Sequence, residues 1–186
     1  MIGDTLLALL GGGTASPPDV DRLRIELNRL QGLVLPTSRF IGARVYNSAA
    51  FSHNSSGSWL AVTFDAERFD TSAIHSTASN TSRLTCVVAG VYSIFGTVQF
   101  AVNATGWRGT RIYLNGATPI ATVLHAASSN TYAILQTVST IYELVAGDYI
   151  EIQAFQDSGG TLALSQQDNT SPEFGMALIG VLVPAT

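Results

Sequence analysis

The chain has 186 residues, of which 46% are hydrophobic and 12% are charged, and it carries a formal net charge of −4. This length suffices for one ordinary domain with a short appendage, and the negative charge gives no basic footprint for a nucleic-acid partner. The single cysteine, Cys86, excludes an internal disulfide framework, and because no apolar run reaches roughly 18 residues we expect no membrane insertion.

Residues 1–18 combine a short apolar patch with a glycine run and a proline pair, GGGTASPP. Glycine runs and proline pairs end regular secondary structure. The apolar stretch is short, has no basic residue before it and carries Asp4, so we do not expect a cleaved signal peptide. We predict that residues 1–18 form a flexible attachment peptide for a partner protein.

Residues 19–36 have the pattern of an amphipathic helix that begins after the proline pair and ends at Pro36. Two heptads are too short to be stable alone, since isolated helices below about 12–15 residues are marginal. Either the helix packs on its own domain, or neighbouring copies of the chain hold it. We predict a short trimeric coiled-coil stem, whose seam at alternating spacings of three and four consists of Val20, Leu23, Leu27, Leu30 and Val34.

Residues 40–186 are predicted to form an all-β head. Short apolar runs separated by turn residues at intervals of roughly 8–12 residues are typical of a sandwich or barrel. Asn115–Gly116 and Gly147–Asp148 are typical of hairpin turns. The predicted strands span 42–47, 59–64, 83–88, 91–102, 109–114, 119–124, 131–136, 138–145, 149–155, 161–165 and 174–183.

Two of these strands, 91–102 and 174–183, are apolar on both faces, although Gly96 leaves a gap in the first. Each sheet of a two-layer sandwich has one inner face, so the second face of these strands needs another cover. Together with the seam helix, this favours two further copies of the chain around a threefold axis. The residues that we assign to this trimer contact are Val91, Phe95, Ala177, Ile179 and Val181.

Five segments carry the motifs of a known family: AVTFD (61–65), SRLTCVVAGVYSIFGTVQF (82–100), RIYLNG (111–116), YELVAGDYIEIQAF (142–155) and SPEFGMALIGV (171–181). In this order they resemble the C1q/tumour-necrosis-factor-like jelly roll over roughly three-quarters of the chain, with Val87 where the family usually has proline. The resemblance implies a homotrimer of ten-stranded sandwiches whose inner sheets meet at the axis.

The N-terminal part lacks the collagen-like repeat of secreted animal members, and the Ser/Thr/Asn-rich head contains no lysine. In this form the chain resembles bacteriophage virion proteins. The resemblance implies a non-enzymatic, homotrimeric appendage on the virion surface, assembled in the host cytoplasm and joined to a capsid or tail protein through residues 1–18. The short chain favours a capsid decoration or head fibre over a tail-tip fibre. The alternative is a lectin-like module on the tail that binds a host-surface glycan or another receptor.

No nucleophile-elbow, zinc-protease or P-loop motif is present, so we expect no enzyme. The segment ATGWRGTR (104–111) is a candidate receptor surface through Trp107, Arg108 and Arg111, or it pairs with a carboxylate of a neighbouring copy. Trp107 is also a candidate for a sugar-binding surface, together with Trp59 and Tyr113. The alternative for these aromatic side chains is burial at the end of the barrel.

Asp65, Glu67 and Asp70 form a small carboxylate cluster. Such oxygen ligands suit Ca²⁺, and the alternative is a solvated acidic loop; we expect no other cofactor. His75 is predicted to be a loop histidine, exposed or locally hydrogen-bonded, with stacking at the trimer axis as the alternative. Cys86 is predicted to be a packed, inert thiol.

Overall fold

The computed structural model describes residues 21–23, 25, 26, 29, 40–54, 57–128 and 131–181. The chain divides into two compact units, Met1–Arg39 and Phe40–Thr186. The described residues of the first unit are helical, and they include Leu23 of the predicted seam. The predicted attachment peptide 1–18 lies outside the described residues, as do the other seam residues, which are Val20, Leu27, Leu30 and Val34.

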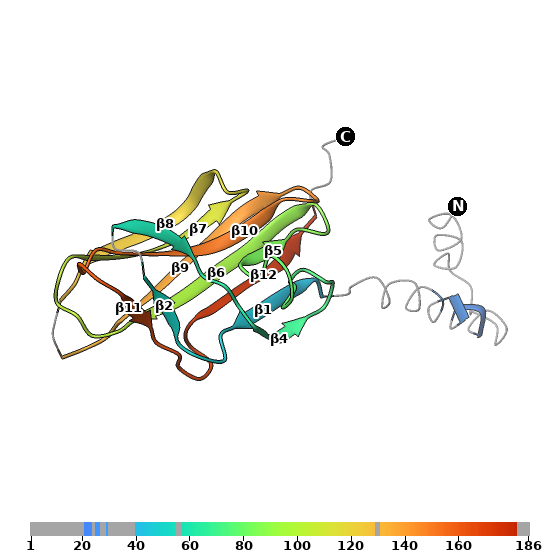
Figure 1. The fold of residues 1–186 in the computed structure, drawn as a ribbon. Coiled ribbons are helices and arrows are strands. Elements are labelled where there is room, and N and C mark those ends of the chain that lie inside the picture. Colours follow the sequence, from blue (N-terminus) through green and yellow to red (C-terminus); the bar gives the residue numbers. More distant parts are fainter. Residues whose placement is uncertain are drawn as a thin grey trace, which may run out of the picture. The chain divides into compact units, whose positions relative to one another are not determined.

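The second unit is a β sandwich (Figure 1). Twelve strands lie in the described part of this unit. They are β1 (Gly42–Tyr46), β2 (Phe51–His53), β3 (Ser58–Ala61), β4 (Ala66–Asp70), β5 (Arg83–Thr85), β6 (Gly90–Phe100), β7 (Trp107–Leu114), β8 (Thr118–Ala126), β9 (Ile134–Leu144), β10 (Tyr149–Gln156), β11 (Leu162–Leu164) and β12 (Glu173–Gly180).

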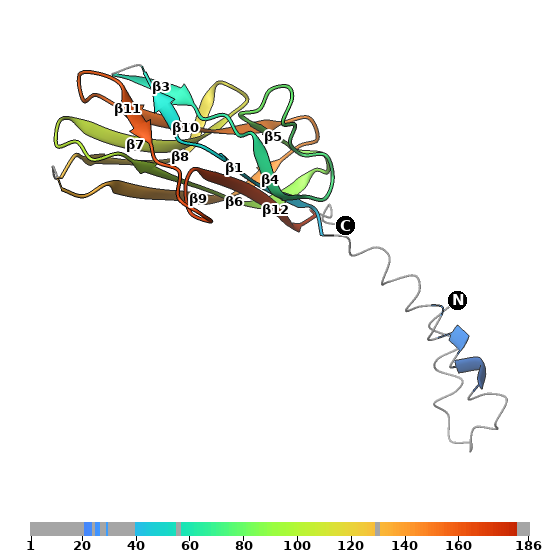
Figure 2. The same ribbon diagram turned by 60° about the horizontal axis from the view of Figure 1, so that its bottom comes forward.

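The strands form two antiparallel sheets, which Figure 2 shows as two layers. One has seven strands in the order β2-β11-β6-β12-β1-β4, with β9 also paired to β6; we call it the β6 sheet. The other has five strands in the order β3-β10-β7-β8, with β5 also paired to β10; we call it the β10 sheet. The all-β prediction is therefore confirmed.

The strand count differs from the ten strands that the resemblance implied. Segments 131–136 and 138–145 were predicted as two strands, but β9 runs through Thr137 without a break and pairs with the whole length of β6. Strands β2 and β4 were not predicted, because FSH is short and AERFD is largely charged. Merging one pair and adding two strands converts the eleven predicted segments into the twelve observed.

The core lies between the two sheets, and β6 supplies alternate residues to it as predicted. Gly96 has no side chain on this face, and the side chain of Ile152 from β10 occupies the space that this leaves. A Cβ atom built on Gly96 would lie 2.1 Å from Ile152 Cδ1. The fully buried residues of β6 are Tyr92, Ile94, Val98 and Phe100.

Replacing Gly96 with alanine is expected to cost about 1–3 kcal/mol of stability, because the new methyl group displaces buried Ile152. The variant Ile152→Val removes the Cδ1 atom and is expected to cost about 0.5–1.5 kcal/mol alone. The double variant should be less destabilised than the sum of the two, since each change makes room for the other. Denaturant unfolding at one fixed protein concentration measures the three values, and simple additivity would contradict this packing.

Candidate interaction surfaces

The face of the β6 sheet that points away from the core carries exposed apolar side chains. In the register, Ser93 of β6 lies between Ile141 of β9 and Ala177 of β12. The exposed fractions of Ile141, Ile179 and Val181 are 67%, 55% and 60%. We call this surface the outward patch, which consists of Phe40, Phe69, Val91, Phe95, Ile141, Ala177 and Ile179; the exposed Val181 follows directly after β12.

Four of the five residues that the sequence assigned to the trimer contact lie on this outward patch, and the fifth, Val181, follows directly after β12. Ile179 and Val181 are exposed, and Val91, Phe95 and Ala177 are half-buried. The ring of Phe95 lies over Gly175, where a Cβ atom would come within 2.5 Å of its Cε1. The structure therefore brings together on one surface the residues predicted from two separate strands.

The sequence interpretation missed three residues of the outward patch. Ile141 lies in the continuous strand β9. The sequence interpretation divided this strand at Thr137, so it did not give the register that places Ile141 opposite Ser93 of β6. Phe40 and Phe69 form an edge-to-face pair with ring centroids 5.7 Å apart at the β4 side of the sheet. The charged context of Phe69 in AERFD concealed this pair, because no apolar alternation surrounds it.

A buried carboxylate lies beside the outward patch on the same face. The side chain of Glu173 is 2% exposed and forms ion pairs with two arginines. Its Oε2 pairs with Arg44, and its Oε1 accepts hydrogen bonds from Nε and Nη2 of Arg68 at 3.2 and 3.0 Å. The Arg68 guanidinium also lies 3.8 Å from the ring centroid of Tyr46. No pattern in the sequence predicted this cluster.

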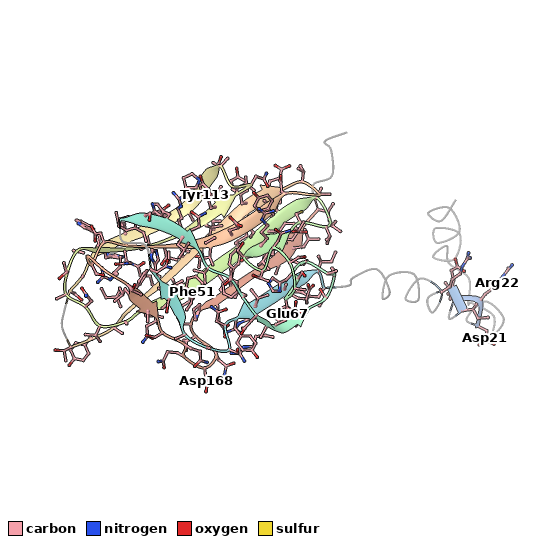
Figure 3. All side chains as sticks on the ribbon, in the orientation of Figure 1. Asp21, Arg22, Phe51, Glu67, Tyr113 and Asp168 are labelled. Carbon is pink, nitrogen blue, oxygen red and sulfur yellow. The ribbon has the colours of Figure 1, made fainter. Side chains whose placement is uncertain are left out.

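On the β10 sheet, Arg111 of β7 lies between two aromatic rings on the face away from the core. Its Cζ is 4.3 Å from the ring centroid of Trp59 and 4.1 Å from that of Tyr113. Its Nε and Nη2 donate to Oε1 of Gln153 at 2.9 and 2.6 Å. Burial lowers the pKa of Arg111 from its usual value. Figure 3 shows Tyr113 on the β7–β8 side of the head.

A second arginine–aromatic contact lies on the same sheet, between Arg83 of β5 and Tyr149 of β10. The Cζ of Arg83 is 3.9 Å from the ring centroid of Tyr149, and its Nε lies 3.3 Å from Oε1 of Glu151. We call these residues the arginine–aromatic ladder, which consists of Trp59, Arg83, Arg111, Tyr113 and Tyr149. The structure thus places Trp59 and Tyr113 on a sheet face, whereas the alternative expectation put them at the barrel end.

The prediction that Arg108 contributes to a receptor surface is wrong. Its exposed fraction is 0%, because the alternation of β7 turns it inward while Trp107 and Arg111 face outward. Its guanidinium donates to the carbonyl oxygens of Asn103, Thr105 and Trp107 at 3.1, 2.9 and 2.8 Å. Burial lowers its pKa. Arg108 therefore holds the loop before β7, and Trp107, at 48% exposed, remains available on the surface.

The three carboxylates of the predicted calcium cluster contact protein groups: Asp65 contacts Ser48, whereas Glu67 and Asp70 both contact His75. Asp65 accepts hydrogen bonds from the backbone nitrogen and hydroxyl of Ser48 at 2.8 and 2.6 Å, and the hydroxyl contact in particular lowers the pKa of Asp65. Glu67 contacts Nδ1 of His75 at 2.9 Å, and Asp70 accepts from the backbone nitrogen of His75 at 2.8 Å. Within the described ranges, no group of three or more His, Cys, Asp or Glu is placed to hold a metal ion.

The side chain of His75 is fully buried, so an exposed loop histidine is excluded. Its Nε2 lies 3.1 Å from the carbonyl oxygen of Thr81, which agrees with local hydrogen bonding. Cys86 is buried too, and burial raises the pKa of its thiol. A raised pKa disfavours the reactive thiolate.

The grooves that described residues of the head line include two shallow ones. One, of about 230 Å³, is lined by residues that include Asp65, and the other, of about 330 Å³, by residues that include His75 and Arg83. Neither groove contains the pair of carboxylates that glycoside hydrolysis requires. Among the described residues, no helix is long and apolar enough to cross a membrane.

No family model matches this chain. An uncharacterised protein of Acanthamoeba polyphaga mimivirus is 38% identical over 84 residues, which amount to 43% of this chain and 36% of that protein. The chain therefore spans well under half of the length of this curated relative.

Solved structures with a similar fold cover the head. The globular domain of zebrafish complement 1qA has a TM-score of 0.55 at 18% identity, over 76% of this chain and 99% of that chain. Murine APRIL at pH 5.0 has a TM-score of 0.58 at 11% identity, over 76% and 100%. Eiger TNF from S. frugiperda has a TM-score of 0.56 at 13% identity, over 79% and 97%. The head therefore has the C1q/TNF-like jelly-roll fold.

Proposed function

We propose that this chain is a non-enzymatic structural protein that forms a homotrimeric appendage on a virion surface. The observation that carries the proposal is the outward patch. Its exposed residues Ile141 and Ile179 lie on a sheet whose other face already packs in the core, and the exposed Val181 follows directly after β12 of that sheet. Contiguous exposed apolar surface of this kind marks an interaction site, and a cyclic assembly of identical chains covers it on every copy.

The fold and the sequence relative support two parts of this proposal. The likeness to the C1q and TNF jelly rolls shows the fold, and the resemblance in sequence implies threefold assembly through the β6 sheet. The mimivirus relative favours a viral setting for the chain. The bacteriophage setting, and a capsid decoration or head fibre as the position, rest on the resemblance in sequence alone.

Residues 1–18 are proposed to join the head to a capsid or tail protein. Deleting them is expected to leave the oligomeric state and the circular dichroism of the head unchanged, but to abolish its incorporation into particles. The measurement is mass spectrometry of gradient-purified virions from the genome that encodes the chain. A variant with residues 1–18 replaced by a Gly/Ser linker of equal length is the matched control and should also be absent.

Particles that retain the deletion variant would place the attachment site in the stem or the head. Particles that lack even the full-length chain would contradict the virion assignment itself. Both results leave the oligomeric state as a separate question, because that state is measured on the purified protein.

A further inference from the structure

We infer that the outward face of the β10 sheet binds an acidic carbohydrate, with Arg111 pairing with a carboxylate of the sugar. This inference deepens the proposed function, because a virion appendage exposes the face that the outward patch leaves free. The two surfaces lie on different sheets of the sandwich (Figure 2). Covering the outward patch with further copies therefore leaves the β10 sheet accessible to a ligand.

The central observation is that Arg111 is a cation without a carboxylate partner. Within the described part of the chain, no Asp or Glu oxygen lies within 4.0 Å of its guanidinium nitrogens. Its Nε and Nη2 donate to the neutral amide of Gln153, so Nη1 remains for a ligand. By contrast, Arg83 on the same ladder already pairs with Glu151.

The rings around Arg111 fix its position before any ligand arrives. Trp59 and Tyr113 hold the guanidinium between them, and Gln153 orients its plane. Trp59 can reach this position because Gly109 has no side chain: a Cβ atom there would lie 2.8 Å from Trp59 Cη2 and 2.9 Å from Leu124 Cδ1. An arginine that is held in this way loses little conformational entropy when it pairs with a planar carboxylate.

The sheet face around Arg111 offers contacts for the neighbouring rings of an oligosaccharide, because Trp107 lies four residues along β7 from Arg111. Trp107 and Leu124 lie on the same face, each 48% exposed, and give an apolar contact for the C–H groups of a pyranose. Thr122 lies beside Arg111 in the register and is exposed, so it offers a hydroxyl group. A cation beside apolar and hydroxyl groups on an open sheet face favours an acidic sugar over a neutral one.

The test compares matched acidic and neutral oligosaccharides by isothermal titration calorimetry on the full chain. The pairs are sialyllactose with lactose, and trigalacturonic acid with its methyl ester. At least one acidic member should bind about tenfold or more tightly than its neutral partner, since a charge-assisted hydrogen bond is worth that factor. The preference should weaken as salt is added.

The variant Arg111→Gln should abolish the preference, whereas Arg83→Gln should retain it, because Arg83 is already paired. Trp107→Ala is a second variant, outside the arginine–aromatic ladder, and should weaken the binding of the same acidic sugar. Equal binding of both members of each pair, or no binding of any sugar, overturns the inference, as does equal loss in Arg111→Gln and Arg83→Gln. Binding of an acidic peptide in place of every sugar also overturns it.

The oligomeric mass, measured on the same sample, distinguishes a failure of this inference from a failure of the proposed function. A trimer that binds no acidic sugar contradicts the ligand and leaves the assembly intact. A monomer that binds an acidic sugar through Arg111 contradicts the assembly and leaves the ligand intact.

Discussion

Replacing Ile141 with glutamate is expected to convert the proposed trimer into a folded monomer. Ile141 is 67% exposed on the outward face of β9, so the substitution leaves the core of the single chain untouched. In the assembly it removes up to about 1.5–3 kcal/mol of apolar burial per copy, and it brings three carboxylates into one contact, where like charges repel. Light scattering after size-exclusion chromatography measures the mass, and circular dichroism reports the fold.

The matched control is Leu124→Glu. Leu124 is an exposed apolar residue in the β10 sheet, at 48%, and it faces away from the core on the opposite side of the sandwich. This variant receives the same charge but is expected to remain a trimer. An Ile141→Glu variant that stays trimeric would show that the contact does not use this part of the outward patch. Dissociation of both variants would mean that any added charge breaks the assembly.

Replacing both arginines that pair with Glu173 is expected to lower the stability of the head more than the other substitutions proposed for it. With Arg44→Met and Arg68→Met together, the carboxylate, whose side chain is 2% exposed, loses both ion-pair partners. Breaking a buried ion pair in this way costs about 3–5 kcal/mol. Each single variant should cost clearly less, because the other arginine still pairs with the carboxylate.

The test of this cluster is a third substitution. Adding Glu173→Gln to the double variant removes the unpaired charge and should recover a large part of the lost stability. Urea unfolding at one fixed protein concentration compares the variants, since the stability of an assembly depends on concentration. Two results together would contradict the pairing of Glu173 with both arginines. The double variant would lose no more stability than the sum of two small single losses, and adding Glu173→Gln would restore none of it.

The jelly roll could be predicted where sequence alternation has a clear contrast. In β6, apolar residues alternate with Ser93, Thr97 and Gln99, so the buried face could be assigned correctly. Gly96 was identified as a gap, but the residue that fills it, Ile152, lies on the other sheet and only the packing shows the match. Long-range pairing of this kind leaves no local signal.

The phase of β7 could not be predicted, because both of its faces carry an arginine. Arg108 points inward to backbone carbonyl groups, and Arg111 points outward between aromatic rings. A buried arginine bonded to carbonyl oxygens has no pattern that distinguishes it from a surface arginine. The burial of Glu173 could not be predicted either. Its two partners come from β1 and β4 and lie far from it in the sequence.

The most direct test of the assembly is the solution mass of the unmodified chain, measured by light scattering on a size-exclusion column. The chain has a mass of 19.6 kDa, and threefold assembly through the outward patch predicts a mass near three times that value. A mass near 19.6 kDa at concentrations where the protein is folded would contradict the account, because the exposed Ile141, Ile179 and Val181 would then need a different cover.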